Sequence, residues 1–122
     1  MQYDYVTTLF EGHSQPNKVT IAFTLAVNAL NKGHSATIVL MLNAVELGKP
    51  GAMMDINIGQ PFEPVANLLT CFLDKGGTLA VCKSCLLHNG LTEADIDTRF
   101  PIITGGDVVD LVMAAKGTMQ IT

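Results

Sequence analysis

Short runs of apolar and β-branched residues alternate along this chain with longer segments that have helical periodicity. The strand-like runs are Asp4–Phe10, Ala36–Leu42, Thr78–Val81, Phe100–Thr104 and Thr118–Thr122. Strands that alternate with helices form right-handed βαβ units with parallel strands. The near-continuous apolar run Ala36–Leu42 is typical of a strand buried on both faces of such a sheet. The sequence therefore predicts an α/β fold with a mostly parallel, doubly wound sheet.

Three segments between these runs have the spacing of helices that present an apolar stripe. They are Asn17–Asn31, a segment that begins at Pro61 and carries apolar residues from Phe62 to Leu73, and Asp107–Lys116. Proline is favoured at a first helical position, so Pro61 fits a helix start, and Gly76-Gly77 fits its end. Shorter helical turns are expected over Asn43–Gly48 and directly after Cys82. The 122 residues suit one domain spanning 1–122.

The predicted helix Asn17–Asn31 carries no charge on the side that solvent would normally cover. That side has a second apolar row, Ile21, Leu25 and Ala29, beside a polar row, Thr20, Thr24 and Asn28. Two interpretations stay open: the helix is buried within the monomer, or it forms a subunit interface. The low share of charged residues, 15%, also leads us to expect a homo-oligomer.

Composition and charge exclude several classes of protein. Apolar residues make up 48%, which excludes a disordered chain. Seven scattered basic residues against eleven acidic ones, a net charge of −4, argue against direct nucleic-acid binding. Apolar runs such as Ile38–Leu42 fall far short of the roughly 20 residues of a membrane span, so no membrane contact is expected. The first residues lack the pattern of a signal peptide, and we expect a cytoplasmic protein.

Cys82 has the surroundings of a nucleophile. It follows a predicted strand, and reactive groups in α/β sheets gather at the carboxyl ends of the strands. A helix that begins directly after it would stabilise a thiolate through its backbone N–H groups, and Lys83 adds a nearby positive charge. The alternative is that Cys82 is a small buried residue without a chemical role.

Cys85 completes a Cys-x-x-Cys pattern, which has three interpretations. A thioredoxin-like pair usually follows the first strand of its fold and has a different spacer from Lys83-Ser84. A zinc site needs a second compact pair of ligands, which the chain does not offer, so no metal is expected. Cys85 can instead be a supporting or resolving thiol that traps Cys82 as a disulfide after oxidation. Cys71, inside a predicted helix, is expected to be structural.

The three histidines are weaker candidates. His88 lies three residues past Cys85 and would assist proton transfer or, the interpretation we prefer, interact only with the helix end. His13 follows the first predicted strand and would line a site at the carboxyl rim or lie on plain surface. His34 fits a turn. Neither a G-x-x-x-x-G-K-[ST] nor a G-x-G-x-x-G pattern occurs, so no nucleotide cofactor, and no other cofactor, is expected.

The segment Lys49–Gln60 is expected to be a loop, because it contains Pro50, Gly51 and Gly59. It also carries two adjacent methionines, Met53 and Met54. We expect this loop to cover a reactive group and to shield it from water and oxidants.

The cysteine segment resembles that of a known family. Val81-Cys82-Lys83-Ser84-Cys85-Leu86-Leu87-His88-Asn89-Gly90-Leu91 is similar to the cysteine segment of the DsrE/DsrF-like family, which includes TusD-type sulfur-relay subunits and YchN-like proteins. Upstream, the residues from Asn31 to Leu40 resemble the family's entry to its second strand, and those from Asn43 to Leu47 resemble the segment after it. With the closing helix and strand, the resemblance spans nearly the whole chain.

The resemblance implies a three-layer, flavodoxin-like or DsrE-like fold that assembles into trimers or hexamers. It also implies a sulfur carrier or sulfurtransferase-like protein whose persulfide forms on Cys82, with sulfur donor and acceptor proteins or low-molecular-weight thiols as partners. The second cysteine, Cys85, departs from the family's sulfur-relay heterohexamers and leaves the pathway open. Two alternatives remain: a thiol–disulfide redox or sensor protein that uses Cys82 and Cys85, and a non-catalytic oligomeric scaffold.

Overall fold

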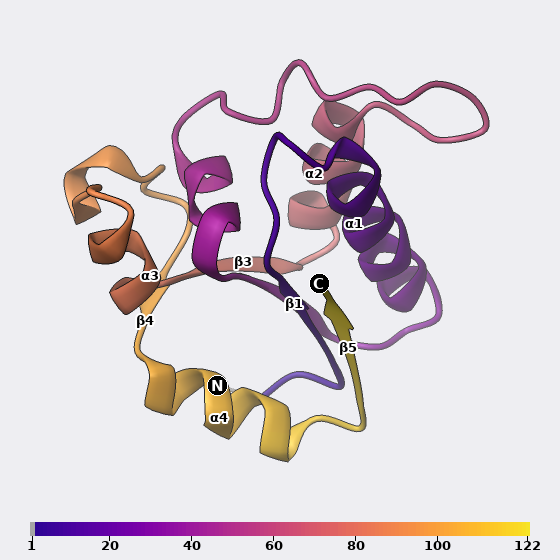
Figure 1. Ribbon diagram of the computed structural model, residues 1–122. Helices are drawn as coiled ribbons and strands as arrows, with labels where there is room; N and C mark the ends of the chain where they lie inside the picture. The colour runs from indigo at the N-terminus through magenta and orange to yellow at the C-terminus, as the bar shows by residue number, and fades with distance from the viewer. Residues whose placement is uncertain (1) are drawn as a thin grey trace.

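The computed structural model describes residues 2–122 (Figure 1). In chain order, its elements are β1 (Tyr5–Leu9), α1 (Pro16–Asn31), β2 (Ala36–Leu40), the 3-10 helix η1 (Leu42–Gly48), α2 (Val65–Asp74), β3 (Thr78–Cys82), α3 (Lys83–His88), the 3-10 helix η2 (Glu93–Asp95), β4 (Ile102–Ile103), α4 (Gly105–Ala114) and β5 (Gly117–Ile121). The alternation of strands and helices that the sequence predicts is confirmed.

The five strands form one sheet in the order β4-β3-β2-β1-β5, and every neighbouring pair is parallel. The central strand β2 is buried along its whole length, as its apolar run predicts. The edge strand β4 is shorter than expected and pairs only with the last residues of β3, Val81 and Cys82. One reason is Pro101, which has no N–H to donate to a ladder, although its carbonyl accepts from the Val81 N–H at 2.9 Å.

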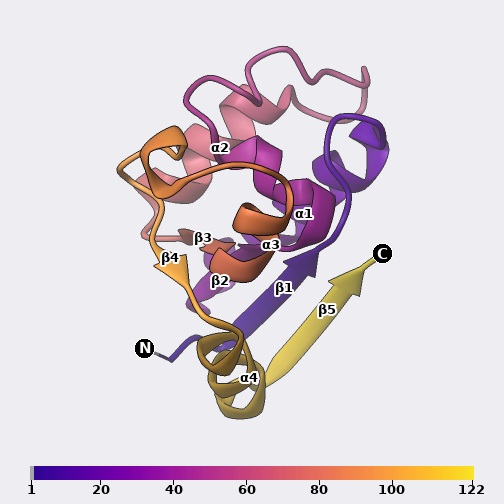
Figure 2. The same ribbon diagram turned by 60° about the vertical axis from the view of Figure 1, so that its left-hand side comes forward.

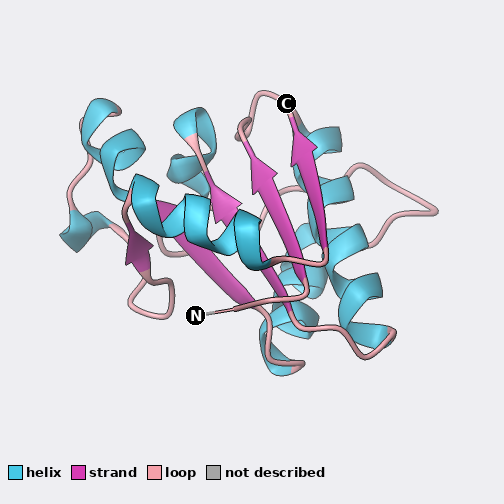
Figure 3. Ribbon diagram, turned by 90° about the horizontal axis from the view of Figure 1, so that it is seen from below, coloured by secondary structure: helices cyan, strands magenta, loops and turns pink. Residues whose placement is uncertain are grey.

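Helices cover both faces of the sheet, which gives the predicted three layers (Figures 1 and 3). Helices α1 and α2 pack on one face and meet through Phe23 and Phe72, whose ring centroids lie 6.0 Å apart in an edge-on arrangement. Helix α4 crosses the other face, where Val108 and Leu111 belong to a smaller core with Val6 of β1. The fold is therefore an α/β three-layer structure with a parallel sheet.

The start of α2 was predicted wrongly. The helix begins at Val65, four residues after the expected start at Pro61. The physical reason is a second proline: Pro64 precedes the helix, and the residue before a proline is disfavoured in helical conformation. Glu63 occupies that position, so a helix that continues from Pro61 through Glu63 is disfavoured.

The uncharged side of α1 forms hydrogen bonds within the helix itself. Thr20 Oγ1 donates to the Pro16 carbonyl at 2.7 Å, Thr24 Oγ1 to the Thr20 carbonyl at 2.8 Å, and Asn28 Nδ2 to the Thr24 carbonyl at 2.9 Å. Thr20 is fully buried within this chain, whereas Ile21 and Leu25 are half-buried. The chain thus covers part of this side, and a subunit interface over the remainder stays a prediction.

Candidate functional site

Cys82 lies where β3 ends and α3 begins (Figure 2). Its backbone is still extended, with φ −72° and ψ 120°, and the next residue, Lys83, starts the helix. Cys82 is therefore the N-cap of α3 and lies at the carboxyl end of strand β3. The sequence predicts this position at a strand-to-helix junction. Its side chain is only 3% exposed, whereas Lys83 is exposed. The thiol thus belongs to the protein interior.

Cys85 faces Cys82 across the first turn of α3. Cys82 is the N-cap residue of α3, and Cys85, which is 9% exposed, is the third helical residue. The pKa of the Cys85 thiol is raised, first by burial and then by interaction with the neighbouring Cys82 thiol. The interaction between the two thiols therefore favours the protonated form of Cys85.

The turn after β2 is bound to the cysteine helix through Leu42 and Asn89. Leu42 has a left-handed backbone, φ 45°, which a residue of this type rarely adopts. Its backbone acts to lower the pKa of the Cys85 thiol, against the effect of burial, and its carbonyl accepts from Asn89 Nδ2 at 3.2 Å. The same Nδ2 donates to the Cys85 carbonyl at 2.8 Å. The Cys85 side chain is thereby held between η1 and the end of α3.

The sequence predicts Asn89 only as the end of the helix, together with Gly90, and gives no signal for Leu42. The helix does end there: Asn89 is the C-cap of α3, and Gly90 has φ 76°. A second role for Asn89 could not be read from its neighbours in the chain, because its partner Leu42 is 47 residues away.

A second cluster of polar groups lies around His13, at the carboxyl end of β1. The Glu46 Oε1 accepts from the His13 N–H at 2.7 Å and lies 2.9 Å from His13 Nδ1. His13 Nε2 pairs with the Ala52 carbonyl, and the same Nε2 lies 3.9 Å from Asp55 Oδ1. A Cβ atom on Gly12 would clash with the Glu46 carboxylate, so a larger residue there would displace the Glu46 side chain. His13 thus joins the β1–α1 turn, η1 and the long loop.

The pKa shifts in this cluster have opposite signs. Burial opposes protonation of His13, but the Ala52 carbonyl, Glu46 and Asp55 outweigh it, and the pKa of His13 is raised. Burial disfavours the charged form of Glu46 as well, but its bonds with His13 prevail, and the pKa of Glu46 is lowered. Both ring nitrogens of His13 face acceptors, so the doubly protonated imidazolium is the form that satisfies both.

A family model described as the DsrE/DsrF-like family matches residues 5–120. The chain belongs to this family. No curated protein matches the sequence. The family match confirms the predicted resemblance to the DsrE/DsrF-like family, and the parallel three-layer architecture confirms the predicted α/β fold class.

Solved structures similar to this DsrE/DsrF-like chain cover almost its whole length. The YchN protein from E. coli is 18% identical, with a TM-score of 0.66 over 98% of this chain and 99% of its own. A protein of unknown function from Methanobacterium thermoautotrophicum is 14% identical, with a TM-score of 0.68 over 97% and 98%. Another from Bacteroides thetaiotaomicron is 18% identical, with a TM-score of 0.65 over 97% and 95%. At these identities, the likeness shows the shared fold.

The other predicted site residues of this DsrE/DsrF-like chain are spread out. His88 is exposed in the last turn of α3, while Cys85, three residues earlier, is buried, so proton transfer by His88 stays a prediction. His34 lies in the turn before β2, with Nδ1 3.6 Å from Asp4 Oδ2. Among residues 2–122, no group of three His, Cys, Asp or Glu side chains is arranged to hold a metal ion. Across the same residues, no helix has the length and apolar character needed to cross a bilayer.

The two methionines of the long loop have different surroundings. Met53 is 3% exposed and belongs to the large core, whereas Met54 is 67% exposed. A small hollow of about 30 Å³ beneath the loop is lined by both methionines and also by Leu69 and Phe100. Met53 thus fastens the loop to the body of the protein, and shielding of a persulfide by the loop stays a prediction.

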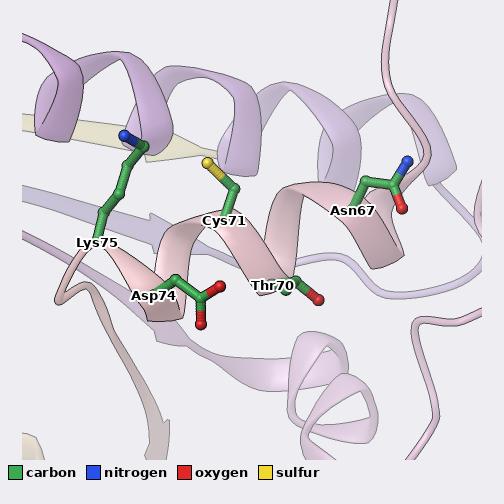
Figure 4. A pocket seen from close by; sticks show the side chains of 5 residues that line it. All are labelled: Asn67, Thr70, Cys71, Asp74 and Lys75. Atoms are coloured by element: carbon green, nitrogen blue, oxygen red, sulfur yellow. The ribbon is translucent and has the colours of Figure 1, made fainter.

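Cys71 lies on a different part of the DsrE/DsrF-like domain. It is partly exposed on α2, at an open depression of about 480 Å³ (Figure 4). The residues that line it are Asn67, Thr70, Cys71, Asp74 and Lys75. The Cys71 and Lys75 side chains point to the α1 side of the helix in this view. All five belong to α2 or its end, so the depression is separate from the cysteine pair.

Proposed function

We propose that this chain accepts sulfane sulfur as a persulfide on Cys82 and passes it to an acceptor thiol. The observation that carries the proposal is the arrangement of the pair: Cys82 is the N-cap residue at the junction of β3 and α3, and its thiol neighbours that of Cys85. Sulfur transfer uses the thiolate, which is the nucleophilic form of cysteine. Membership of the DsrE/DsrF-like family supports a sulfur-relay role.

The transfer is balanced without an external oxidant. The Cys82 thiolate attacks the outer sulfur of a donor persulfide, R–S–SH, and the donor leaves as R–S⁻, which takes up a proton. The product is Cys82–S–SH. Attack by an acceptor thiolate on the outer sulfur reverses the roles, so that Cys82 returns as a thiolate and the sulfur moves on.

Burial of Cys82 requires a local opening for each transfer. The side chain is 3% exposed, and a persulfide extends it by only about 2 Å, one sulfur–sulfur bond. The neighbouring elements suit such an opening, because α3 has six residues and its outer side, with Leu87 and His88, is exposed. Short elements with few buried contacts open at low free-energy cost.

The partners that we propose are a sulfur donor and an acceptor, each a protein or a low-molecular-weight thiol, in the cytoplasm. We also propose a homo-oligomer, a trimer or hexamer. Large apolar side chains on the surface support it, since they are candidates for burial between copies. They are Leu42, Met54, Leu87, Val109, Met113 and Met119, each at least 39% exposed.

Intact-mass spectrometry after treatment with glutathione persulfide tests the carrier function. The Cys85→Ser variant, which lacks the second thiol of the pair, should gain the mass of one sulfur atom with or without a further Cys71→Ala substitution, and Cys82→Ala should gain none. Cys71 is the matched control, because it is a more exposed free thiol outside the pair. Equal sulfur gain in Cys82→Ala and Cys85→Ser would overturn the assignment of Cys82.

A thiol–disulfide redox protein is the second candidate, and the contact between the two thiols favours it. Cys-x-x-Cys pairs at the start of a helix exchange readily between dithiol and disulfide. This alternative predicts that Cys85→Ser gains no sulfur, while the wild type loses two protons in a reaction that needs both Cys82 and Cys85. The mass spectrum therefore separates the two candidates directly.

A further inference from the structure

The two buried thiols offer a reaction that sulfur relay does not require. Cys82 and Cys85 occupy the N-cap and third positions of α3 and are 3% and 9% exposed. The two thiols are close enough for Cys82 to raise the pKa of Cys85. Any sulfur carried on Cys82 therefore has Cys85 as its immediate thiol neighbour, while thiols in solution reach it only after the site opens.

We propose that Cys85 is a resolving thiol that discharges the Cys82 persulfide as hydrosulfide and leaves a Cys82–Cys85 disulfide. The proposal rests on the proposed function, because the persulfide must form first. It adds a second fate for the bound sulfur: release as sulfide in place of transfer to an acceptor.

The reaction is balanced within the protein. The Cys85 sulfur attacks the inner sulfur of Cys82–S–SH, so that the bond between Cys82 and Cys85 forms as the bond to the outer sulfur breaks. The outer sulfur takes the electron pair and leaves as HS⁻, while the Cys85 proton is released. Two cysteines are oxidised to a disulfide, and the sulfane sulfur is reduced to sulfide. A new round requires an external thiol to reduce the disulfide, so without one the reaction occurs once per chain.

The surroundings of Cys85 suit this attack. The attack needs the thiolate of Cys85, and burial opposes its formation by raising the pKa of the thiol. The Leu42 backbone counteracts burial, because it acts to lower the same pKa, and the proton that Cys85 loses can be taken up by the departing sulfide. Asn89 holds Leu42 and Cys85 in place, since its Nδ2 donates to the carbonyls of both residues.

A single-turnover experiment tests the proposal. The wild type, Cys85→Ser, Cys85→Ala and Cys71→Ser are loaded with glutathione persulfide, freed of excess donor without a reductant, and followed over time. Free sulfide and intact mass are measured in each sample. Circular dichroism confirms that both Cys85 variants keep the fold, and two replacements of different polarity separate loss of the thiol from disturbed packing.

We expect the wild type and Cys71→Ser to release one sulfide per chain and to end two protons lighter than the reduced protein. Both Cys85 variants should load sulfur and retain it. Equal sulfide release from wild type and the Cys85 variants, or a wild type that retains its persulfide, would overturn the resolving role and leave the carrier function intact. Failure of the wild type and both Cys85 variants to load sulfur would instead overturn the proposed function, and with it this inference.

Discussion

The carboxyl rim of the sheet has two regions of opposite character, which η1 connects. At one end of η1, Leu42 lies near Cys85, which belongs to the large buried apolar cluster. At the other end, Glu46 pairs with His13, and both of these side chains are about 40% exposed. One edge of a sheet thus combines a dry thiol pair with a hydrated ion pair.

The difference shows how burial changes what a polar group does. Around Cys85, burial sets the protonation state of the thiol, so chemistry can depend on it. Around His13, solvent screens the charges, and exposed pairs of this kind contribute little to stability. The proposed reaction therefore belongs to the cysteine pair, while the contacts of His13 fasten the long loop to η1.

The largest effect is expected from the packing beneath the cysteine pair. Leu86 is fully buried in α3, while its neighbour Leu87 is 57% exposed. Leu86→Ala should lower the free energy of unfolding by about 2–5 kcal/mol, because it leaves a cavity in the core. Leu87→Ala, the matched control, should change it by less than about 0.5 kcal/mol. Urea unfolding of both variants measures this, and equal losses would contradict the buried character of the thiol region.

A smaller effect is expected from the amide that connects η1 to α3. Asn89→Ala removes the hydrogen bonds to the Leu42 and Cys85 carbonyls, which should cost about 1–2 kcal/mol of unfolding free energy. It should also speed alkylation of Cys85 in native protein, because the turn at Leu42 is released. The alkylation rate is followed by mass spectrometry, with Cys71 as the internal reference. Unchanged protection of Cys85 would show that Asn89 does not hold the site closed.

The smallest effect, expected at the hydrated region, depends on pH. The pKa of His13 is raised above its ordinary value of 6.5, so its contribution is complete below that pH and is lost as pH rises through the folded-state value. The pKa of Glu46 is lowered from 4.5, so its contribution is complete above that pH and is lost as pH falls through the folded-state value. The pair therefore stabilises the fold most between pH 4.5 and 6.5.

His13→Gln tests this pH dependence. The substitution should remove a contribution of less than about 1 kcal/mol inside the window and almost none well above it. Urea unfolding of wild type and variant, once at a pH inside the window and once well above it, gives the difference in unfolding free energy at each pH. An equal loss at the two pH values would show that the charge of His13 does not contribute.

The sequence predicts what depends on local pattern. The parallel sheet, the strand-to-helix junction at Cys82 and the end of α3 at Gly90 all follow from spacing and residue type along the chain. The prediction for the start of α2 is wrong for a local reason as well, since the helix begins after Pro64 and not at Pro61.

The parts that could not be predicted depend on contacts between distant segments. His13 and Glu46 are 33 residues apart, and nothing near either one in the sequence indicates the other. The left-handed turn at Leu42 falls on a residue type that gives no signal for it. The deep burial of Cys82 is also a tertiary property, because the sequence places it only at the rim of the sheet.

Location of the sulfur within the chain tests the central claim most directly. Protein treated with glutathione persulfide is blocked with an alkylating reagent under denaturing conditions and digested, and the cysteine peptides are sequenced by tandem mass spectrometry. To preserve the persulfide from discharge, the Cys85→Ser variant is analysed beside the wild type. The account predicts the additional sulfur on Cys82 and none on Cys71. Sulfur on the partly exposed Cys71, or on no cysteine in either protein, would contradict it.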